Sequence, residues 1–179
     1  MTIETLALQG RDTLHPGLAG IDTARLKAIR NASLRACFNR LEETSYRMEF
    51  VARVRGREYI NDAAARSINA TWYTLENTEG GIIWIATGGN NHVDYSPLRS
   101  VALRKVRMLL CVGDDNRHLH ESFKGIIPNI VDADSIGTAV HKACYSNLDK
   151  CKVIYSPATE GFLTTEQSGE VFRHEVNEL

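Results

Sequence analysis

The chain has 179 residues, of which 43% are hydrophobic and 24% are charged, and its formal net charge is -1. This length suits one well-packed domain with a short appendage, and the composition excludes a disordered or fibrous chain. The near-neutral charge, without a cluster of Lys and Arg interleaved with aromatic residues, excludes a nucleic-acid-binding surface.

The same features predict where the protein works. No apolar run approaches the ~20 residues of a membrane span, and Met1–Gly10 lacks the basic and then apolar pattern of a signal peptide. We therefore expect a cytoplasmic protein with no membrane partner and no nucleic-acid partner. The cysteines form no C-x-x-C pair, which predicts reduced thiols at Cys37, Cys111, Cys144 and Cys151.

The first predicted elements are helices, and two strands follow them. Apolar residues recur at helical spacing over residues 18–41, with a break at 31–33 where Ser33 can cap a second helix. β-Forming residues on both sides of Gly56, within Met48–Ile60, predict two strands joined by a tight turn. We place a helical segment at residues 1–43 and the main domain at residues 44–179.

From residue 63 onward the pattern alternates between helices and short apolar strands. This alternation is typical of an α/β fold with a Rossmann-like, mostly parallel sheet flanked by helices, which binds ligands at the carboxyl ends of its strands. The predicted strands are Ile82–Ala86, Met108–Val112, Asn129–Val131 and Lys152–Tyr155. The predicted helices are Ala63–Leu75, Leu98–Lys105, Asn116–Phe123, Ser135–Asn147 and Thr165–Asn177.

Two loops lie where a ligand would be expected. The loop Thr87–Asp94 has paired glycines that let a backbone approach a ligand, although it is equally well explained as a turn in which Asp94 or Ser96 caps the next helix. The turn Tyr155–Phe162 has no partnering His or Lys nearby, so nucleophilic catalysis is not expected. No glycine-rich motif of the P-loop type is present to hold ATP.

The remaining polar residues have structural explanations. His118 and His120 are two positions apart on a predicted helix and therefore point in different directions, so we expect no metal site there. Glu160 and Asp62 can form a carboxylate pair or be separate, solvated acids.

Several short blocks, read together, keep the order and spacing of one family. They are Leu8–Arg11, Tyr46–Val54, Tyr59–Asp62, Asn69–Tyr73, Ile83–Ala86, Asp94–Leu98 and Tyr155–Ala158. These blocks resemble the Mur ligases, and specifically the carboxyl-terminal domain of the UDP-N-acetylmuramoyl-L-alanine:D-glutamate ligases. The resemblance implies a Rossmann-like domain from about residue 44, preceded by a helical remnant of the central ATPase domain.

The resemblance also implies which positions face the substrate. In the family the central domain supplies the P-loop, the magnesium ligands and a carbamylated lysine, and the carboxyl-terminal domain closes over it. By resemblance, the vestigial substrate-binding positions here are Arg47, Asp62, Arg66, Asn90, Asp94, Ser156 and Gly161.

This chain departs from the family at those positions. The lysine of the family's D-S-K-A-T-N motif is absent from Asp62–Ser67, where Arg66 stands two positions later. The aspartate and lysine of the glycine loop are replaced, with Asn90 in that loop. Gly161 stands where the family has a serine, beside Glu160, which would repel a carboxylate. Loss of these donors should cost several kcal/mol or more of affinity, since a bound carboxylate needs charge-assisted hydrogen bonds.

We therefore expect a pseudoenzyme, with no catalytic residue and no metal ligand. It would act as a stand-alone binding or interaction module linked to peptidoglycan synthesis. The alternatives are the substrate-binding part of a D-glutamate ligase that works with a separate ATPase domain, and a decayed fragment. We expect no cofactor on this chain alone, and ATP with Mg²⁺ only where a separate ATPase domain is present. The predicted partner is a protein, or a second copy bound through the N-terminal helices.

Overall fold

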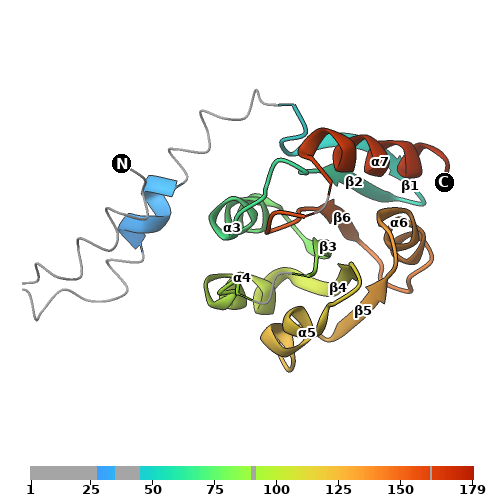
Figure 1. The fold of residues 1–179 in the computed structure, drawn as a ribbon. Helices are drawn as coiled ribbons and strands as arrows, with labels where there is room; N and C mark the ends of the chain where they lie inside the picture. Colours follow the sequence, from blue (N-terminus) through green and yellow to red (C-terminus); the bar gives the residue numbers. More distant parts are fainter. Residues whose placement is uncertain (1–27, 35–44, 90–91, 162) are drawn as a thin grey trace, which may run out of the picture. The chain divides into compact units, whose positions relative to one another are not determined.

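A computed structural model describes residues 28–34, 45–89, 92–161 and 163–179 (Figure 1). The chain divides into two units, Met1–Cys37 and Phe38–Leu179. In the first unit, residues 28–34 form one helical run. The break that the sequence predicted at 31–33 is therefore wrong, because Ser33 continues a helix instead of capping a new one. The rest of the predicted hairpin lies outside the described residues, and the boundary at 43 stays a prediction.

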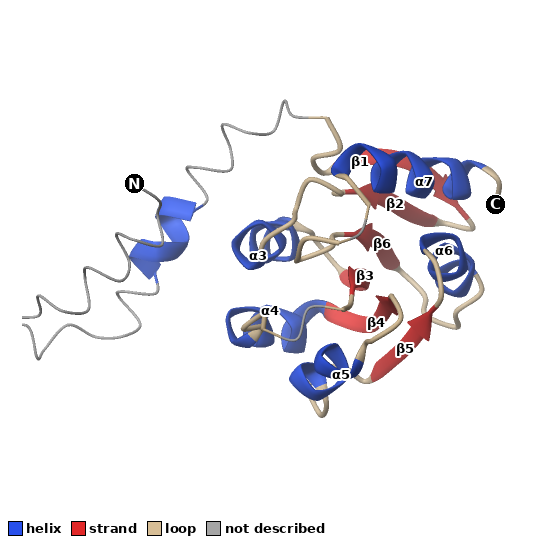
Figure 2. Ribbon diagram, in the orientation of Figure 1, coloured by secondary structure: helices blue, strands red, loops and turns tan. Residues whose placement is uncertain are grey.

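The second unit is built on a six-stranded sheet (Figure 2). Its strands are β1 (Glu49–Val54), β2 (Arg57–Asn61), β3 (Gly81–Thr87), β4 (Val106–Val112), β5 (Asn129–Ala133) and β6 (Cys151–Tyr155). The order across the sheet is β1-β2-β6-β3-β4-β5. All neighbouring strands are parallel except β1, which pairs antiparallel with β2. The predicted mostly parallel α/β fold is confirmed.

Helices cover both faces of this sheet. They are α3 (Ile68–Asn77), α4 (Ser96–Lys105), α5 (Arg117–Phe123), α6 (Ile136–Cys144) and α7 (Thr165–Asn177). Figure 1 shows α3, α4 and α5 on one face and α6 and α7 on the other. The central strand β3 is consequently buried on both faces from Ile82 to Ala86, which explains its uninterrupted apolar sequence.

Each face has its own packed core. On one face, the Trp84 and Phe123 rings meet edge to face with centroids 5.4 Å apart. On the other, Tyr155 stacks on Phe172 at 5.5 Å. Side chains of successive residues in a strand point to opposite faces, so β3 and β6 contribute to both cores.

The predicted hairpin is present, and its turn explains the role of Gly56. Arg55 and Gly56 both have positive φ, 49° and 78°, the conformation that a two-residue hairpin turn requires. Glycine adopts it without steric cost. The turn leaves Arg57 at the first position of β2, where its guanidinium enters the protein.

One predicted helix begins later than expected. The sequence predicted helix from Ala63, but α3 begins at Ile68, after Ser67 caps it by accepting a hydrogen bond from the Ala70 amide. Residues 63–67 instead form a loop held against the end of β6, where the Ala65 carbonyl accepts from the Ala158 amide at 3.0 Å. Tertiary hydrogen bonds override the local helical propensity of the alanines in this loop.

Candidate functional site

A cavity of about 440 Å³ lies at the carboxyl ends of the parallel strands. Residues that follow β3, β4, β5 and β6 all contribute to its wall. The residues of the wall include Arg66, Gly88, Gly89, Asp114, Asp115, Asp134, Tyr155, Gly161 and Leu163. We call this cavity the crevice.

The topology places the crevice there. The connection after β3 leads to α4 on one face, whereas that after the neighbouring β6 leads to α7 on the opposite face. Connections that leave adjacent strands toward opposite faces open a gap at the strand ends, which is where doubly wound sheets bind ligands. The location predicted from the sequence therefore coincides with a real cavity.

The paired glycines serve packing as well as the crevice wall. The Gly88 amide donates to the Val112 carbonyl at 2.8 Å, and the Gly89 amide donates to the Asp115 carbonyl at 2.7 Å. A Cβ at Gly88 would lie 2.0 Å from the Asn116 Oδ1 atom. Glycine is thus required at 88 because the loops after β3 and β4 approach each other closely.

The lining of the crevice is acidic. Asp114, Asp115 and Asp134 contribute three carboxyl groups, and Arg66 is the one Lys or Arg among the described residues that line it. A ligand that carries carboxylate or phosphate would therefore meet more negative than positive charge in this crevice.

The side chain of Arg66 is already bound within the protein. Its Nε donates to the Glu160 Oε2 atom at 2.7 Å, and its Nη1 donates to the Leu163 carbonyl at 2.8 Å. Its Nη2 lies 2.6 Å from the same Glu160 oxygen. Glu160 thus occupies the forked face of the guanidinium that a ligand carboxylate would use.

Arg47 and Asp62 form a second ion pair, which is buried outside the lining of the crevice. The Arg47 Nη1 atom donates to the Asp62 Oδ1 atom at 2.7 Å, and the two side chains are 4% and 0% exposed. Burial raises the pKa of the Asp62 carboxyl to about 6, although Arg47, Thr74 and the Met48 amide lower it. The two acids of the predicted Glu160–Asp62 pair therefore each contact a different arginine.

Of three further predicted substrate-binding positions, two contact the protein itself and one lies outside the residues that the structure describes. Ser156 is fully buried, and its hydroxyl lies 2.8 Å from that of Thr71. Asp94 accepts from the Ser96 amide at 2.9 Å, a local contact just before α4. The N-cap of α4 is Tyr95, without a side-chain cap hydrogen bond, so the predicted capping by Asp94 or Ser96 is wrong. Asn90 lies outside the described residues.

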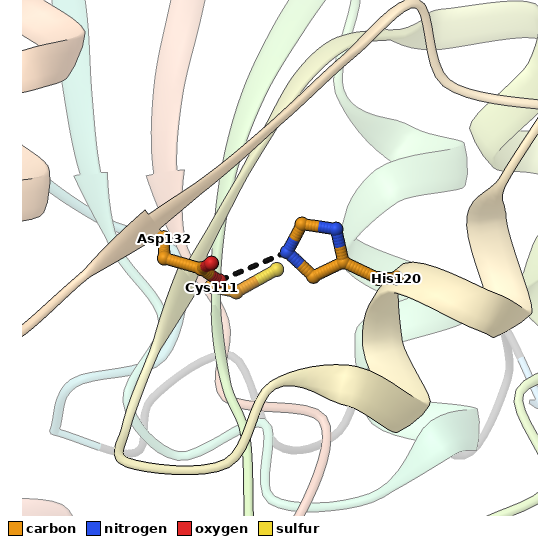
Figure 3. A group of neighbouring side chains, drawn as sticks. All are labelled: Cys111, His120 and Asp132. Atoms are coloured by element: carbon orange, nitrogen blue, oxygen red, sulfur yellow. Dashed lines mark hydrogen bonds and ion pairs between the residues drawn. The ribbon is translucent and has the colours of Figure 1, made fainter.

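The structure also brings together three side chains that sequence reasoning did not connect (Figure 3). Cys111 in β4, His120 in α5 and Asp132 in β5 each offer one donor atom, and these atoms lie within 4.8 Å of one another. The His120 Nε2 atom lies 2.9 Å from the Asp132 Oδ1 atom. His118, the other half of the predicted pair, contacts the Val93 carbonyl instead. No short spacing joins the three residues, so only the pairing of β4 with β5 could reveal them.

Comparison with known proteins gives consistent matches along the whole chain. UDP-N-acetylmuramoylalanine–D-glutamate ligases from Porphyromonas gingivalis and Christiangramia forsetii are 36% and 31% identical to it, over 100% of the chain. The same ligase from Salinibacter ruber is 29% identical, again over 100% of the chain. It is a homologue of the carboxyl-terminal part of these ligases.

The whole chain is matched, but only part of each ligase is. The chain spans about 40% of the length of these ligases. No family model matches it. Among the described residues, no helix is long and apolar enough to cross a membrane.

The seven positions that the resemblance suggested do not all lie in the crevice. Arg66 and Gly161 line it. Arg47, Asp62 and Ser156 are buried in contacts with the protein itself. A serine at Gly161, as in the resembling motif, would bring its Cβ to 3.0 Å from the Thr87 Cγ2 atom, so restoring the motif requires Thr87 to shift. Binding roles for these positions stay a prediction.

Proposed function

We propose that this chain is a non-catalytic relative of the D-glutamate-adding ligases that acts as a binding or interaction module in peptidoglycan synthesis. The observation that carries the proposal is the contact between Arg66 and Glu160 at the edge of the crevice. An internal carboxylate holds the cation that would otherwise receive the carboxylate of an incoming amino acid.

The lining supports the same conclusion through charge. Asp115 is paired with Arg117, just as Arg66 is paired with Glu160, so Asp114 and Asp134 give the crevice its negative balance. In a partly enclosed site, charge repulsion is screened less than on the open surface. D-Glutamate and the UDP-linked substrate both carry negative charge, and both should bind poorly.

The described lining residues also provide few groups for chemistry. None of them is Lys, His or Cys, the side chains that most often serve as a base or an activated nucleophile near neutral pH. Thr87, Ser135 and Tyr155 provide hydroxyl groups there, but burial raises the pKa of Tyr155. We infer that the crevice binds without catalysing ligation.

The test is thermal unfolding of the purified chain with D-glutamate, ATP–Mg²⁺ and the UDP-muramoyl-alanine substrate added separately. A ligand at 100 times its Kd stabilises the folded state by about 2.7 kcal/mol, which moves the midpoint by several degrees. We expect no shift with any of the three. Ligase activity of the purified chain would contradict the proposal.

A variant tests the role of Glu160 directly. Glu160→Ala should release Arg66 and produce a midpoint shift with D-glutamate that the unsubstituted chain lacks. The Glu160 side chain is 78% exposed, so the substitution should leave the fold intact. Glu178→Ala, an exposed acid beyond the end of α7, is the matched control and should give no shift.

The second candidate is the substrate-binding part of a ligase whose ATPase domain is a separate chain. It is favoured by the partial span of the relatives and by the presence of a cavity with Arg66 at its edge. A shift of the unsubstituted chain with D-glutamate or the UDP-linked substrate would support this candidate. Recovery of a P-loop protein in a pull-down from the native host would support it further.

A further inference from the structure

Cys111, His120 and Asp132 form a cluster that contains none of the residues lining the crevice. His120 and Asp132 line a neighbouring cavity that shares Asp114, Asp115 and Asp134 with the crevice. The cluster joins three elements that are separate in the sequence, β4, α5 and β5. We call these three side chains the Cys-His-Asp cluster.

The parallel pairing of β4 with β5 fixes two of the three residues. Cys111 and Asp132 are direct partners in the register of these strands. Neighbouring strands lie about 4.8 Å apart, and partnered residues in parallel strands point to the same face. The pairing of the strands therefore places the Cys111 thiol and the Asp132 carboxylate side by side on one face of the sheet.

Helix α5 supplies the third residue from above that face. Leu119 and Phe123 anchor the helix, because both are buried and Phe123 packs on Trp84. This anchoring directs the neighbouring His120 toward the strands, where Nε2 meets Asp132 at 2.9 Å. Figure 3 shows the Cys111 sulfur pointing toward the edge of the imidazole that Asp132 contacts.

We propose that the Cys-His-Asp cluster is a Zn²⁺ site, with Cys111 Sγ, His120 Nε2 and Asp132 Oδ1 as protein ligands and the fourth position taken by water. Thiolate, imidazole and carboxylate are the three ligand types of protein-bound zinc. Metal–ligand bonds of about 2.0–2.3 Å place tetrahedral donors roughly 3.3–3.7 Å apart. The three donor atoms already lie within 4.8 Å of one another, so small side-chain adjustments would suffice.

A nucleophilic cysteine is the competing interpretation of this residue set, and the geometry disfavours it. In a catalytic triad the carboxylate orients the histidine through the nitrogen remote from the nucleophile. Here Asp132 contacts Nε2, on the edge that faces Cys111. Cys111 is also fully buried, and a substrate could not reach its sulfur. A carboxylate and a thiol that converge on one edge of an imidazole are better arranged for a cation.

Binding requires one change of protonation. Burial, and then the nearby Asp132, raise the pKa of the Cys111 thiol to about 12, so the metal-free residue is a neutral thiol. Zn²⁺ would replace the thiol proton, which passes to solvent as the Zn–S bond forms. Bound zinc would tie α5 to the edge strand β5 and to its neighbour β4.

The first measurement uses the full chain, freed of metal with a chelator under reducing conditions. Native mass spectrometry should then show one Zn²⁺ bound per chain after titration. Co²⁺ used as a probe should give the near-ultraviolet absorption band of a thiolate–cobalt bond, and Zn²⁺ should abolish that band by displacement. The midpoint of thermal unfolding should rise with added Zn²⁺.

Two variants locate the site and two control for the other thiols and imidazoles. His120→Gln and Cys111→Ala should each weaken Zn²⁺ binding by about 100-fold or more. Cys111→Ala should also abolish the thiolate–cobalt band. Cys37→Ala and His174→Gln, the latter an exposed residue of α7, should leave both the affinity and the band unchanged.

Specific outcomes would overturn the proposal. Absence of stoichiometric zinc in the unsubstituted chain is one. Zinc affinity that is unchanged in His120→Gln is another. The His120→Gln measurement remains a valid test even if Cys111→Ala does not fold. A cobalt band lost in Cys37→Ala but kept in Cys111→Ala would place the metal elsewhere.

Discussion

Arg47 and Asp62 form an ion pair that water hardly reaches, with side-chain exposures of 4% and 0%. The Arg47 guanidinium also lies over the Tyr73 ring, 5.4 Å from its centroid. Removing both charges from water is costly, and their attraction returns that free energy only while both partners are present. Loss of either partner should therefore destabilise the folded state.

We expect Arg47→Met to lower the free energy of unfolding by about 3 kcal/mol at pH 7, because it leaves the Asp62 carboxylate buried without a counter-charge. The double variant Arg47→Met/Asp62→Asn should recover at least half of that loss. Urea unfolding measures both. If the double variant is as unstable as the sum of its single variants, the two residues do not act as a pair.

The stability of the protein should also depend on the protonation of Asp62. Its pKa of about 6 in the folded state exceeds the ordinary aspartate value of 3.8, so the folded state binds the proton more tightly than the unfolded chain. The contribution of Asp62 is then fully present below about pH 4 and is lost as pH rises through 6. Relative to Asp62→Asn, the free energy of unfolding should fall by about 2 kcal/mol between pH 4 and pH 7.

Urea unfolding at a series of pH values checks this expectation. The comparison with Asp62→Asn removes the contributions of the other titrating groups, which the two proteins share. A difference that stays constant, or rises with pH, would mean that Arg47 outweighs burial at this carboxyl.

At the scale of elements, one arginine joins β2 to α6. The Arg57 guanidinium donates to backbone carbonyls at the end of α6 and beyond it, to Ala143 at 2.6 Å, Cys144 at 2.8 Å and Ser146 at 2.7 Å, and to Leu148 at 2.7 Å. These are carbonyls that a helix end leaves without partners, and a cation there also complements the helix dipole.

Arg57→Lys should destabilise the protein by about 2 kcal/mol or more, since a compact ammonium cannot reproduce the guanidinium fork. Amide hydrogen exchange should accelerate in residues 143–148. The matched control is Arg53→Lys on β1, where the side chain is 63% exposed and the change should cost less than about 0.5 kcal/mol. Equal effects of the two substitutions would show that the carbonyl contacts contribute little.

At the scale of the whole molecule, self-association through the N-terminal segment stays a prediction. Ile29 in the helical run 28–34 is 56% exposed. If this segment pairs two copies, Ile29→Asp should convert a dimer to a monomer in light scattering, and Asn31→Asp should not, because residues two apart lie on different faces of a helix. A monomeric mass for the unsubstituted chain would remove the prediction.

How much of the crevice could be predicted depended on what each residue contacts. Periodicity located the strands, and parallel strands place their following loops at one edge, so the position of the crevice followed from local sequence. Contacts between residues far apart in the sequence could not be predicted in this way. Glu160 and Arg66 are 94 positions apart, and no local pattern indicates that an acid in one loop binds an arginine in another.

The sequence by itself determined the α/β fold, because apolar runs of strand and helix length depend on neighbours along the chain. It also indicated the relationship to the D-glutamate-adding ligases through short blocks kept in order. Only the tertiary structure decided which charges are buried, as for Arg47 and Asp62, and which donors converge, as for Cys111, His120 and Asp132. Burial and convergence are set by strand order and helix packing, which bring together residues that no spacing in the sequence connects.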